Sequence, residues 1–255
     1  MSGKAHRPRL GAQLYSLRDA CETDLAGVLK RLANMGYQGV EFASRPAMPA
    51  AAVATLLADH GLTCPASHVS LEGLEQRLED EIHWVHALGH QLPVIGWVPA
   101  PKTAEQAHVI ACRVALAAER LVRANLPLAW HNHEFEFTPL DGGSTLFDHL
   151  ALIDPPLTWE FDIGWLWFAG QDVASTLARF PGRASIVHVK DIADRQFRTF
   201  TPIGEGGVGY ASLLPTLAST PGIDWLIIEQ DAFAPGLDPF DAMERSLRFV
   251  QERLA

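Results

Sequence analysis

Three features are scarce in this chain of 255 residues, and each scarcity excludes a class of protein. The three cysteines, Cys21, Cys64 and Cys112, lie far apart without CxxC spacing, which argues against a disulfide framework and a zinc knuckle. No stretch approaches the roughly 18 consecutive apolar residues of a membrane span. The segment Met1 to Arg9 is basic and polar without an apolar core, so we expect no signal peptide there. The sequence therefore predicts a cytoplasmic protein with no membrane partner.

Basic residues are also scarce, because 20 Lys and Arg stand against 30 Asp and Glu and give a formal net charge of −10. This balance disfavours a general nucleic-acid-binding surface, although a local basic pocket for a phosphate group is compatible with it. Hydrophobic residues make up 48% of the chain, which is enough for a sizeable core. A chain of this length fits one α/β barrel domain or two small domains.

Apolar runs and breaker residues alternate along the chain in a strand-then-helix rhythm. The predicted strands cover Leu10–Leu14, Gly39–Phe42, Leu62–His68, Leu92–Ile95, Pro127–His131, Thr158–Asp162, Ser185–Val189 and Asp224–Glu229. The predicted helices cover Asp24–Met35, Ala50–His60, Leu71–Leu88, Thr103–Ala124, Thr145–Leu152, Val173–Phe180, Tyr210–Leu217 and Pro239–Arg253. A strand and a helix in every roughly 30 residues indicate an α/β fold, a (β/α)₈ TIM barrel in one domain over residues 1–255. An open doubly wound sheet usually has a glycine-rich turn after its first strand, and residues 13–18 contain no glycine.

The later strands end in side chains that bind metals. Asp162, His188 and Glu229 each stand at the C-terminal end of a predicted strand. In a parallel barrel these ends converge on the face where the active site is built, and imidazole with carboxylate is a ligand set for a divalent metal. The alternatives to metal binding are that Asp162 is a helix N-cap or a loop residue and that His188 is a core histidine. Glu229 follows four apolar residues, and a buried unpaired carboxylate is costly, so a cation is its simplest partner.

The segment from 131 to 136 carries the densest set of candidate side chains. In an extended chain His131 and His133 point to one face, whereas Glu136 points to the other. This spacing lets one strand present two imidazoles to a metal or a substrate. The alternative is a chance histidine-rich loop, since the chain has 11 histidines.

Further candidates for substrate binding stand near the same strand ends. They are Glu41, His68, Trp97, Trp165 and Lys190. Tryptophan beside a carboxylate suits the face of a sugar, while Glu41 and His68 could equally be ordinary strand-end residues. The glycine-rich segment 203–209 lacks both a preceding strand and a GK[ST] ending, so it predicts a mobile loop over the barrel mouth and not a nucleotide site.

With these residues the chain resembles the sugar phosphate isomerase/epimerase superfamily of xylose isomerase-like TIM barrels. That group includes ketose 3-epimerases, hydroxypyruvate isomerase, inosose dehydratase and the class II apurinic endonucleases. The resemblance runs from Leu10 to about Glu252 and is specific in the order and spacing of its motifs. The matching segments are Gly39-Val40-Glu41, His131 to Phe137, Phe161-Asp162 with Trp165, His188 to Asp191, Gly204-Glu205-Gly206 and Glu229-Gln230-Asp231.

The resemblance implies a divalent metal, manganese first, with zinc, cobalt, magnesium or iron as alternatives. Asp162, His188 and Glu229 match the family's ligands on strands six to eight. On strand five the epimerases have a glutamate that binds metal and acts as the second acid/base, whereas this chain has His131 or His133. We assign His133 to the metal, with the choice between the two histidines open. Relatives commonly pair, so the resemblance also implies a homodimer.

The leading hypothesis is a metal-dependent isomerase or epimerase that acts on a sugar, sugar phosphate or cyclic polyol through an enediolate. Glu229 is the predicted general base, and its partner acid is His131, His133 or Glu136. The loss of the strand-five glutamate keeps a second hypothesis, a dehydratase or lyase of a keto-sugar or inosose. An endonuclease is disfavoured by the net charge. A non-catalytic sugar-binding protein is the last alternative, and metal content with turnover of a ketose would distinguish it.

Overall fold

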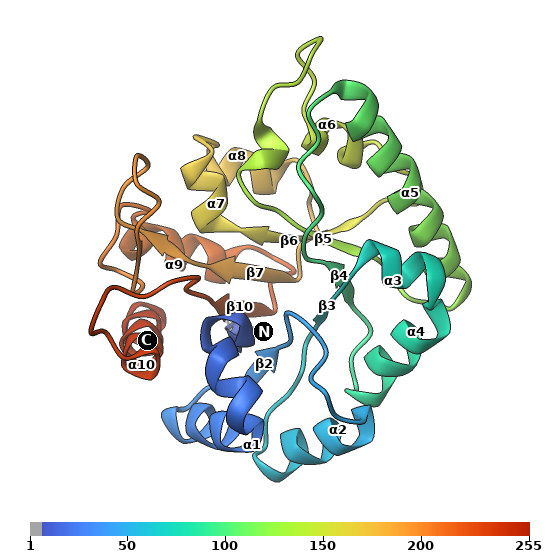
Figure 1. Cartoon of the computed structure of the whole chain (residues 1–255). Helices are drawn as coiled ribbons and strands as arrows, with labels where there is room; N and C mark the ends of the chain where they lie inside the picture. The colour runs from blue at the N-terminus through green and yellow to red at the C-terminus, as the bar shows by residue number, and fades with distance from the viewer. Residues whose placement is uncertain (1–6) are drawn as a thin grey trace, which may run out of the picture.

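The computed structural model describes residues 7–255, which fold as a ring of parallel strands surrounded by helices (Figure 1). Most of the N-terminal segment assessed for a signal peptide, positions 1 to 6, lies outside the described residues. The parallel strands are β1 (Arg9–Gln13), β2 (Gly39–Glu41), β3 (Ser67–Val69), β4 (Pro93–Ile95), β5 (Ala129–His131), β6 (Thr158–Asp162), β7 (Ile186–Val189) and β10 (Trp225–Ile228). The helices are α1 (Arg18–Met35), α2 (Ala50–Asp59), α3 (Leu71–Gln76), α4 (Leu78–Ala87), α5 (Ala104–Arg123), α6 (Leu146–Ala151), α7 (Ile163–Phe168), α8 (Val173–Ala178), α9 (Tyr210–Ser219) and α10 (Pro239–Leu254), with 3₁₀ turns at η1 (Leu14–Leu17) and η2 (Phe135–Phe137). No helix within residues 7–255 is both long and apolar enough to cross a bilayer.

The sheet runs in the order β2-β1-β10-β7-β6-β5-β4-β3, and every neighbouring pair in it is parallel. The strands at the two ends of this order, β2 and β3, are joined by isolated bridges between Gly39 and Thr63 and between Phe42 and Ser67, which close the ring. The predicted (β/α)₈ barrel, folded as one domain, is therefore confirmed.

The inside of the barrel is layered because side chains alternate between the two faces of each strand. Its lower layer is a small apolar cluster formed by Ala66, Val94, Ala129, Ile186, Trp225 and Ile227. Gly39 makes room for this layer, since a Cβ there would lie 2.7 Å from the Trp225 ring. Two residues further along β3, β5, β7 and β10, the inward positions are ionisable: His68, His131, His188 and Glu229.

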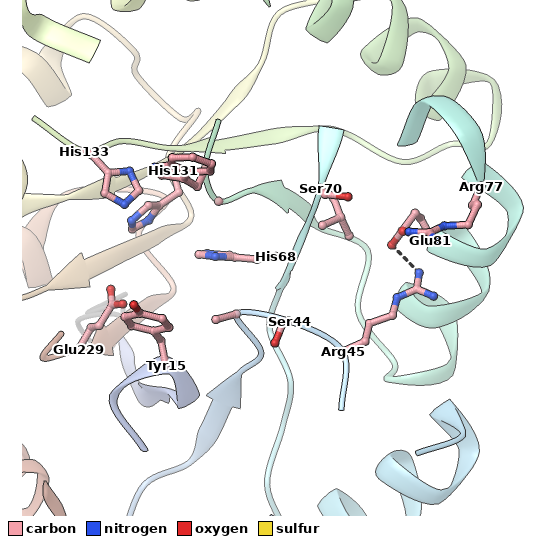
Figure 2. A pocket seen from close by; sticks show the side chains of 14 residues that line it. Tyr15, Ser44, Arg45, His68, Ser70, Arg77, Glu81, His131, His133 and Glu229 are labelled. Carbon is pink, nitrogen blue, oxygen red and sulfur yellow. Dashed lines mark hydrogen bonds and ion pairs between the residues drawn. The ribbon is translucent and has the colours of Figure 1, made fainter. Parts of the chain in front are cut away.

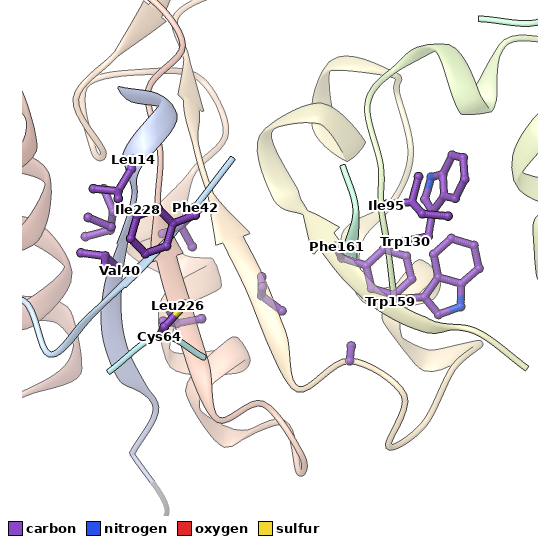
Figure 3. Packing of buried hydrophobic residues seen from close by; sticks show 14 of the residues in the cluster. Leu14, Val40, Phe42, Cys64, Ile95, Trp130, Trp159, Phe161, Leu226 and Ile228 are labelled. Atoms are coloured by element: carbon purple, nitrogen blue, oxygen red, sulfur yellow. The ribbon is translucent and has the colours of Figure 1, made fainter. Parts of the chain in front are cut away.

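The larger core lies between the outside of the barrel and the helices (Figure 3). Trp159 and Phe161 on β6 stack with ring centroids 5.3 Å apart, and Trp130 on the neighbouring β5 is fully buried. On the other side of the ring, Val40 and Ile228 bury aliphatic side chains. Each such side chain contributes about 1.5–3 kcal/mol when fully buried, so this shell holds the strands, and with them the mouth, in place.

Two helix predictions differ from the structure. The single predicted helix over 71–88 is two helices, α3 and α4, because Arg77 between them adopts φ −139° and ψ 41°. The helix predicted to begin at Asp24 belongs to a longer α1 that starts at Arg18. Asp24 is nevertheless non-helical, and its Oδ1 accepts a hydrogen bond from the Gly27 N–H at 2.9 Å, which is the contact that an N-cap side chain makes.

The short helix α7, the two 3₁₀ turns and a hairpin were not predicted from the sequence. The antiparallel strands β8 (Asp191–Ile192) and β9 (Phe200–Thr201) form a hairpin after β7. With two residues in each strand, they are too short to produce a hydrophobic pattern in the sequence.

Candidate active site

The C-terminal ends of the strands bring ionisable side chains together inside the mouth of the barrel. We call this group the polar cluster, and it consists of Glu41, His68, His131, Glu160, Asp162, His188, Lys190 and Glu229. All are buried except His68, whose side chain is 12% exposed. The convergence that the strand ends predicted is present, and it includes a carboxylate that was not singled out from the sequence.

That carboxylate is Glu160, which lies at the centre of the cluster. Its Oε2 is 2.9 Å from His68 Nε2, 3.1 Å from His131 Nδ1 and 3.2 Å from His188 Nε2. Burial raises the pKa of Glu160, but the neighbouring imidazoles outweigh this effect and bring it down to about 2. Because Glu160 stands two residues before Asp162 on β6, strand alternation alone places both on the inner face.

Glu41 and His68 approach the same centre from β2 and β3. Glu41 Oε1 accepts from Gln13 Nε2 at 2.7 Å and lies 2.8 Å from His68 Nε2. Burial lowers the pKa of His68, yet the carboxylates of Glu41 and Glu160 more than reverse this and raise it to about 9. Both residues therefore belong to the ionic network of the site.

Lys190 is a fully buried ammonium that joins three carboxylates. Its Nζ lies 3.1 Å from Asp162 Oδ2, 3.2 Å from Glu229 Oε2 and 2.8 Å from Asp231 Oδ1. Burial lowers the pKa of Lys190, but these carboxylates raise it well above its usual range. Glu229 Oε2 also lies 2.8 Å from His188 Nδ1, so the ends of β6, β7 and β10 form one connected network.

Asp162 has two functions in the structure, one for each oxygen. Its Oδ1 accepts from the Trp165 N–H at 2.9 Å and caps α7, which is the alternative that the sequence had left open. Its Oδ2 faces the polar cluster and lies 4.0 Å from His131 Nε2. The cap fixes the carboxylate so that the second oxygen points at the site.

Two groups of four side chains could each hold a metal ion, since their ligand atoms lie within 4.8 Å of one another. One consists of His131, Asp162, His188 and Glu229; the other consists of His68, His131, Glu160 and His188. Asp162 Oδ2 and His188 Nε2 are buried without a well-aligned hydrogen bond from the described residues, although Lys190 lies close to the first. Imidazole and carboxylate ligand atoms gathered this closely suit a divalent cation, so the residues fit the metal implied by the sequence.

His131 and His188 belong to both groups, whereas His133, to which the sequence analysis assigns the metal, belongs to neither. The reason is that β5 ends at His131 and the chain then turns, so the extended alternation assumed for 131–136 stops there. The His133 ring lies 5.0 Å from that of His131 and stacks on Phe135. Burial, followed by the charge of Lys190, lowers the pKa of His133 to about 3, which leaves a neutral imidazole beside the cluster.

Glu136 lies outside the polar cluster. Its two carboxylate oxygens accept hydrogen bonds from Trp130 Nε1 at 3.2 Å and from the His133 N–H at 2.8 Å. Trp130 alternates with the inward-facing His131 on β5, so Glu136 is on the outer side of that strand. The structure thus separates Glu136 from the other predicted catalytic residues.

The polar cluster opens into a cavity of about 630 Å³ (Figure 2). Of the cluster, His68, His131 and Glu229 line this cavity, together with His133 and the half-exposed Trp97. The other predicted substrate-binding residues, Glu41, Trp165 and Lys190, do not appear in its wall and lie buried behind it. Trp165 packs there with its ring 4.9 Å from Lys190 Nζ.

The glycine-rich segment 203–209 wraps around an internal carboxylate. Asp191 accepts hydrogen bonds from the N–H groups of Gly204, Gly206 and Val208 at 2.8 to 3.3 Å. A Cβ on Gly206 would lie 2.2 Å from Asp191 Oδ1, so only glycine allows this approach. The predicted mobile loop is therefore anchored to the residue that follows Lys190.

Comparison with known proteins identifies the family. The model of the family described as Xylose isomerase-like TIM barrel matches residues 29–253. The chain belongs to this family. The match agrees with the resemblance inferred from the strand-end motifs, and sugar isomerases, epimerases and dehydratases populate the family's neighbourhood.

Individual relatives are distant. Inosose dehydratase of Clostridium tetani (strain Massachusetts / E88) is 22% identical over 148 residues, which are 51% of this chain and 49% of that protein. The chain thus spans about half the length of that curated relative, or less for another from Bacillus cereus (strain AH820). A sugar phosphate isomerase/epimerase from Parabacteroides distasonis ATCC 8503 has a TM-score of 0.81 at 22% identity, covering 98% of this chain and 96% of that one. The probable 3-DHS dehydratase AsbF from Bacillus anthracis has a TM-score of 0.74 at 14% identity, covering 95% and 98%. At these identities the likeness to solved structures shows the fold.

Proposed function

We propose that this protein is a metal-dependent isomerase or epimerase that acts on a sugar, sugar phosphate or cyclic polyol. One observation carries the proposal: Glu229 lines the inner end of the cavity from one side, while the imidazoles of His131 and His133 line it from the other (Figure 2). A carboxylate and an imidazole on opposite sides of a bound carbon can exchange protons with either of its faces.

His131, Asp162, His188 and Glu229 would hold the metal, with manganese as the first candidate. A divalent cation there would polarise the carbonyl and the adjacent hydroxyl of a sugar, which acidifies the proton on the carbon between them. The ammonium of Lys190, which lies beside Asp162 and Glu229, would add positive charge near the site and favour an enediolate electrostatically.

Glu229 is suited to be the base. Burial raises the pKa of its carboxyl, but Lys190 and His188 hold it well below the usual range, so the group is ionised at neutral pH. It can take the carbon-bound proton and return it to the neighbouring carbon, which isomerises an aldose and a ketose. His133, a neutral imidazole with an unpartnered buried Nδ1, is placed to exchange a proton on the opposite face, as epimerisation requires.

A dehydratase is the second candidate, favoured by the inosose dehydratases among the curated relatives. The first step is the same proton abstraction by Glu229, after which the enediolate expels a hydroxyl group from the next carbon as water. The product is lighter than the substrate by one water molecule, so mass spectrometry separates the two reactions.

The test is deuterium incorporation from heavy water into candidate ketoses, with Glu229→Gln compared to wild type. The amide has nearly the same shape but cannot take a proton at neutral pH, so exchange at carbon should fall to background. The amide is also a weaker metal ligand, so metal content is measured in the same samples, and Glu244→Gln on the exposed face of α10 serves as the control. Exchange at the wild-type rate in a metal-loaded Glu229→Gln variant would remove Glu229 from this role.

A further inference from the structure

The cavity has two ends of opposite character (Figure 2). Its inner end is lined by Glu229 and the histidines that adjoin the polar cluster. Its outer end is lined by Arg45, Arg77 and Glu81, and two hydroxyls, Ser44 and Ser70, lie between the ends. Two guanidinium groups and one carboxylate leave a net positive charge at the outer end of a cavity in a strongly acidic protein.

Arg45 is held rigidly at this outer end. One of its nitrogens donates to the Glu81 carboxylate and, at 2.8 Å, to the carbonyl of Asp80, and its guanidinium lies 5.5 Å from the centre of the Trp84 ring. The Glu81 side chain is only 5% exposed, and a Cβ on Gly73 would lie 2.3 Å from its Oε1. Glu81 is therefore packed in place, and its charge is directed to Arg45.

Arg77 is different, because its guanidinium makes no hydrogen bond or ion pair with any residue of the described chain. It stands at the break between α3 and α4, where neither glycine nor proline interrupts the helix. Ser70 begins α3, and its Oγ accepts from the Gly73 N–H at 2.9 Å, so its hydroxyl proton is free to donate. An unpaired fork of N–H donors and free hydroxyls thus face the same cavity.

We infer that the outer end of the cavity binds an anionic group, a phosphate or a carboxylate, at the end of the substrate remote from its carbonyl. Arg77 contributes the unpaired charge, Arg45 the second guanidinium, and Ser44 and Ser70 the intervening hydroxyls. Guanidinium groups bind both anions through paired, charge-assisted hydrogen bonds. The inference rests on the proposed function, which orients the carbonyl of the sugar toward the polar cluster. The substrate class is then an acidic sugar, either phosphorylated or oxidised at its far end.

Three ligands that share the same keto end test this assignment. D-fructose ends in a hydroxymethyl group, D-fructose 6-phosphate in a phosphate and D-fructuronate in a carboxylate. Dissociation constants are measured by calorimetry on the manganese-loaded protein. At least one anion should bind about tenfold or more tightly than D-fructose, as expected for hydrogen bonds between charged groups. Whichever anion is preferred identifies the group that the site takes.

The variant Arg77→Gln should reduce this preference to near one while leaving the affinity for D-fructose unchanged. Arg77→Lys should retain part of it, since an ammonium keeps the charge but loses the paired geometry. Arg248→Gln on the exposed side of α10 makes the same charge change elsewhere and should preserve the preference. Equal affinities for the three ligands, or a preference that survives in Arg77→Gln, would overturn the inference alone. Failure of all three to bind the metal-loaded protein would count against the proposed function as well.

Discussion

The variant Glu136→Gln tests whether this buried carboxyl is structural. Burial raises the pKa of Glu136 from 4.5 to about 8 in the folded protein, against the hydrogen bonds that lower it. A raised carboxyl pKa means that the unfolded chain loses its proton first. Stability from this group is therefore complete below pH 4.5 and declines until pH 8. The difference of 8 − 4.5 = 3.5 units corresponds to about 5 kcal/mol of unfolding free energy.

Glutamine removes this titration but carries only one acceptor oxygen. Either the Trp130 or the His133 N–H then lacks a partner, at a cost of about 1–3 kcal/mol that does not depend on pH. Urea unfolding curves from pH 5 to pH 9 should therefore cross, with the variant less stable than wild type at low pH and more stable at high pH. Curves that stay parallel would refute the reasoning. Because Glu136 lies on the outer side of β5, the variant should also keep wild-type proton exchange, and loss of that exchange at full metal content would return Glu136 to the catalytic set.

Three further predictions concern other buried groups. Asp162→Asn keeps an N-cap for α7 but loses a carboxylate ligand, so elemental analysis should find the metal lost. In the metal-free state its free energy of unfolding should exceed that of Asp162→Ala by about 1 kcal/mol, and equal stability of the two variants would contradict the cap. Burial lowers the pKa of His90 to about 4, so its contribution to stability is complete above pH 6.5 and declines toward pH 4. In His90→Asn the free energy of unfolding should therefore fall by about 3 kcal/mol less than in wild type between pH 6.5 and pH 4, and an equal fall in both proteins would count against this. Gly206→Ala should lower unfolding free energy by about 1–3 kcal/mol, since the new methyl group meets Asp191, and an unchanged melting temperature would argue that the loop yields freely.

Most of the fold could be predicted because apolar runs and breaker residues alternate along the sequence as strands and helices alternate in the barrel. The strand over 158–162 matches β6 in full, six others differ by one or two residues at their ends, and the strand predicted over 62–68 overlaps β3 only at Ser67 and His68. The break at Arg77 was missed because no glycine or proline stands at it, and the helical spacing of the leucines continues from α3 into α4. Tertiary contacts around Glu81 and Arg45, not local preference, accompany the change of direction.

The site was predictable as a set of strand ends but not as a set of contacts. Asp162, His188 and Glu229 converge as their positions after apolar runs indicated. Which of His131 and His133 lies in the polar cluster depends on where β5 stops, and strand ends are the least certain feature of a sequence pattern. Glu160 was not predicted because it lies inside an apolar strand and not at its end. The two-residue period of a strand nevertheless places it on the same face as Asp162.

The closure of the barrel gives the site a mechanical consequence. Between β2 and β3 the ring is joined only by isolated bridges and a few backbone hydrogen bonds, such as that from the His68 N–H to the Phe42 carbonyl at 2.8 Å. Glu41 and His68 stand on opposite sides of this seam, and their ion pair crosses it at the mouth. A ligand that competes for the His68 imidazole therefore acts directly on the least connected joint of the ring. We therefore expect binding at the mouth to influence the pairing of β2 with β3.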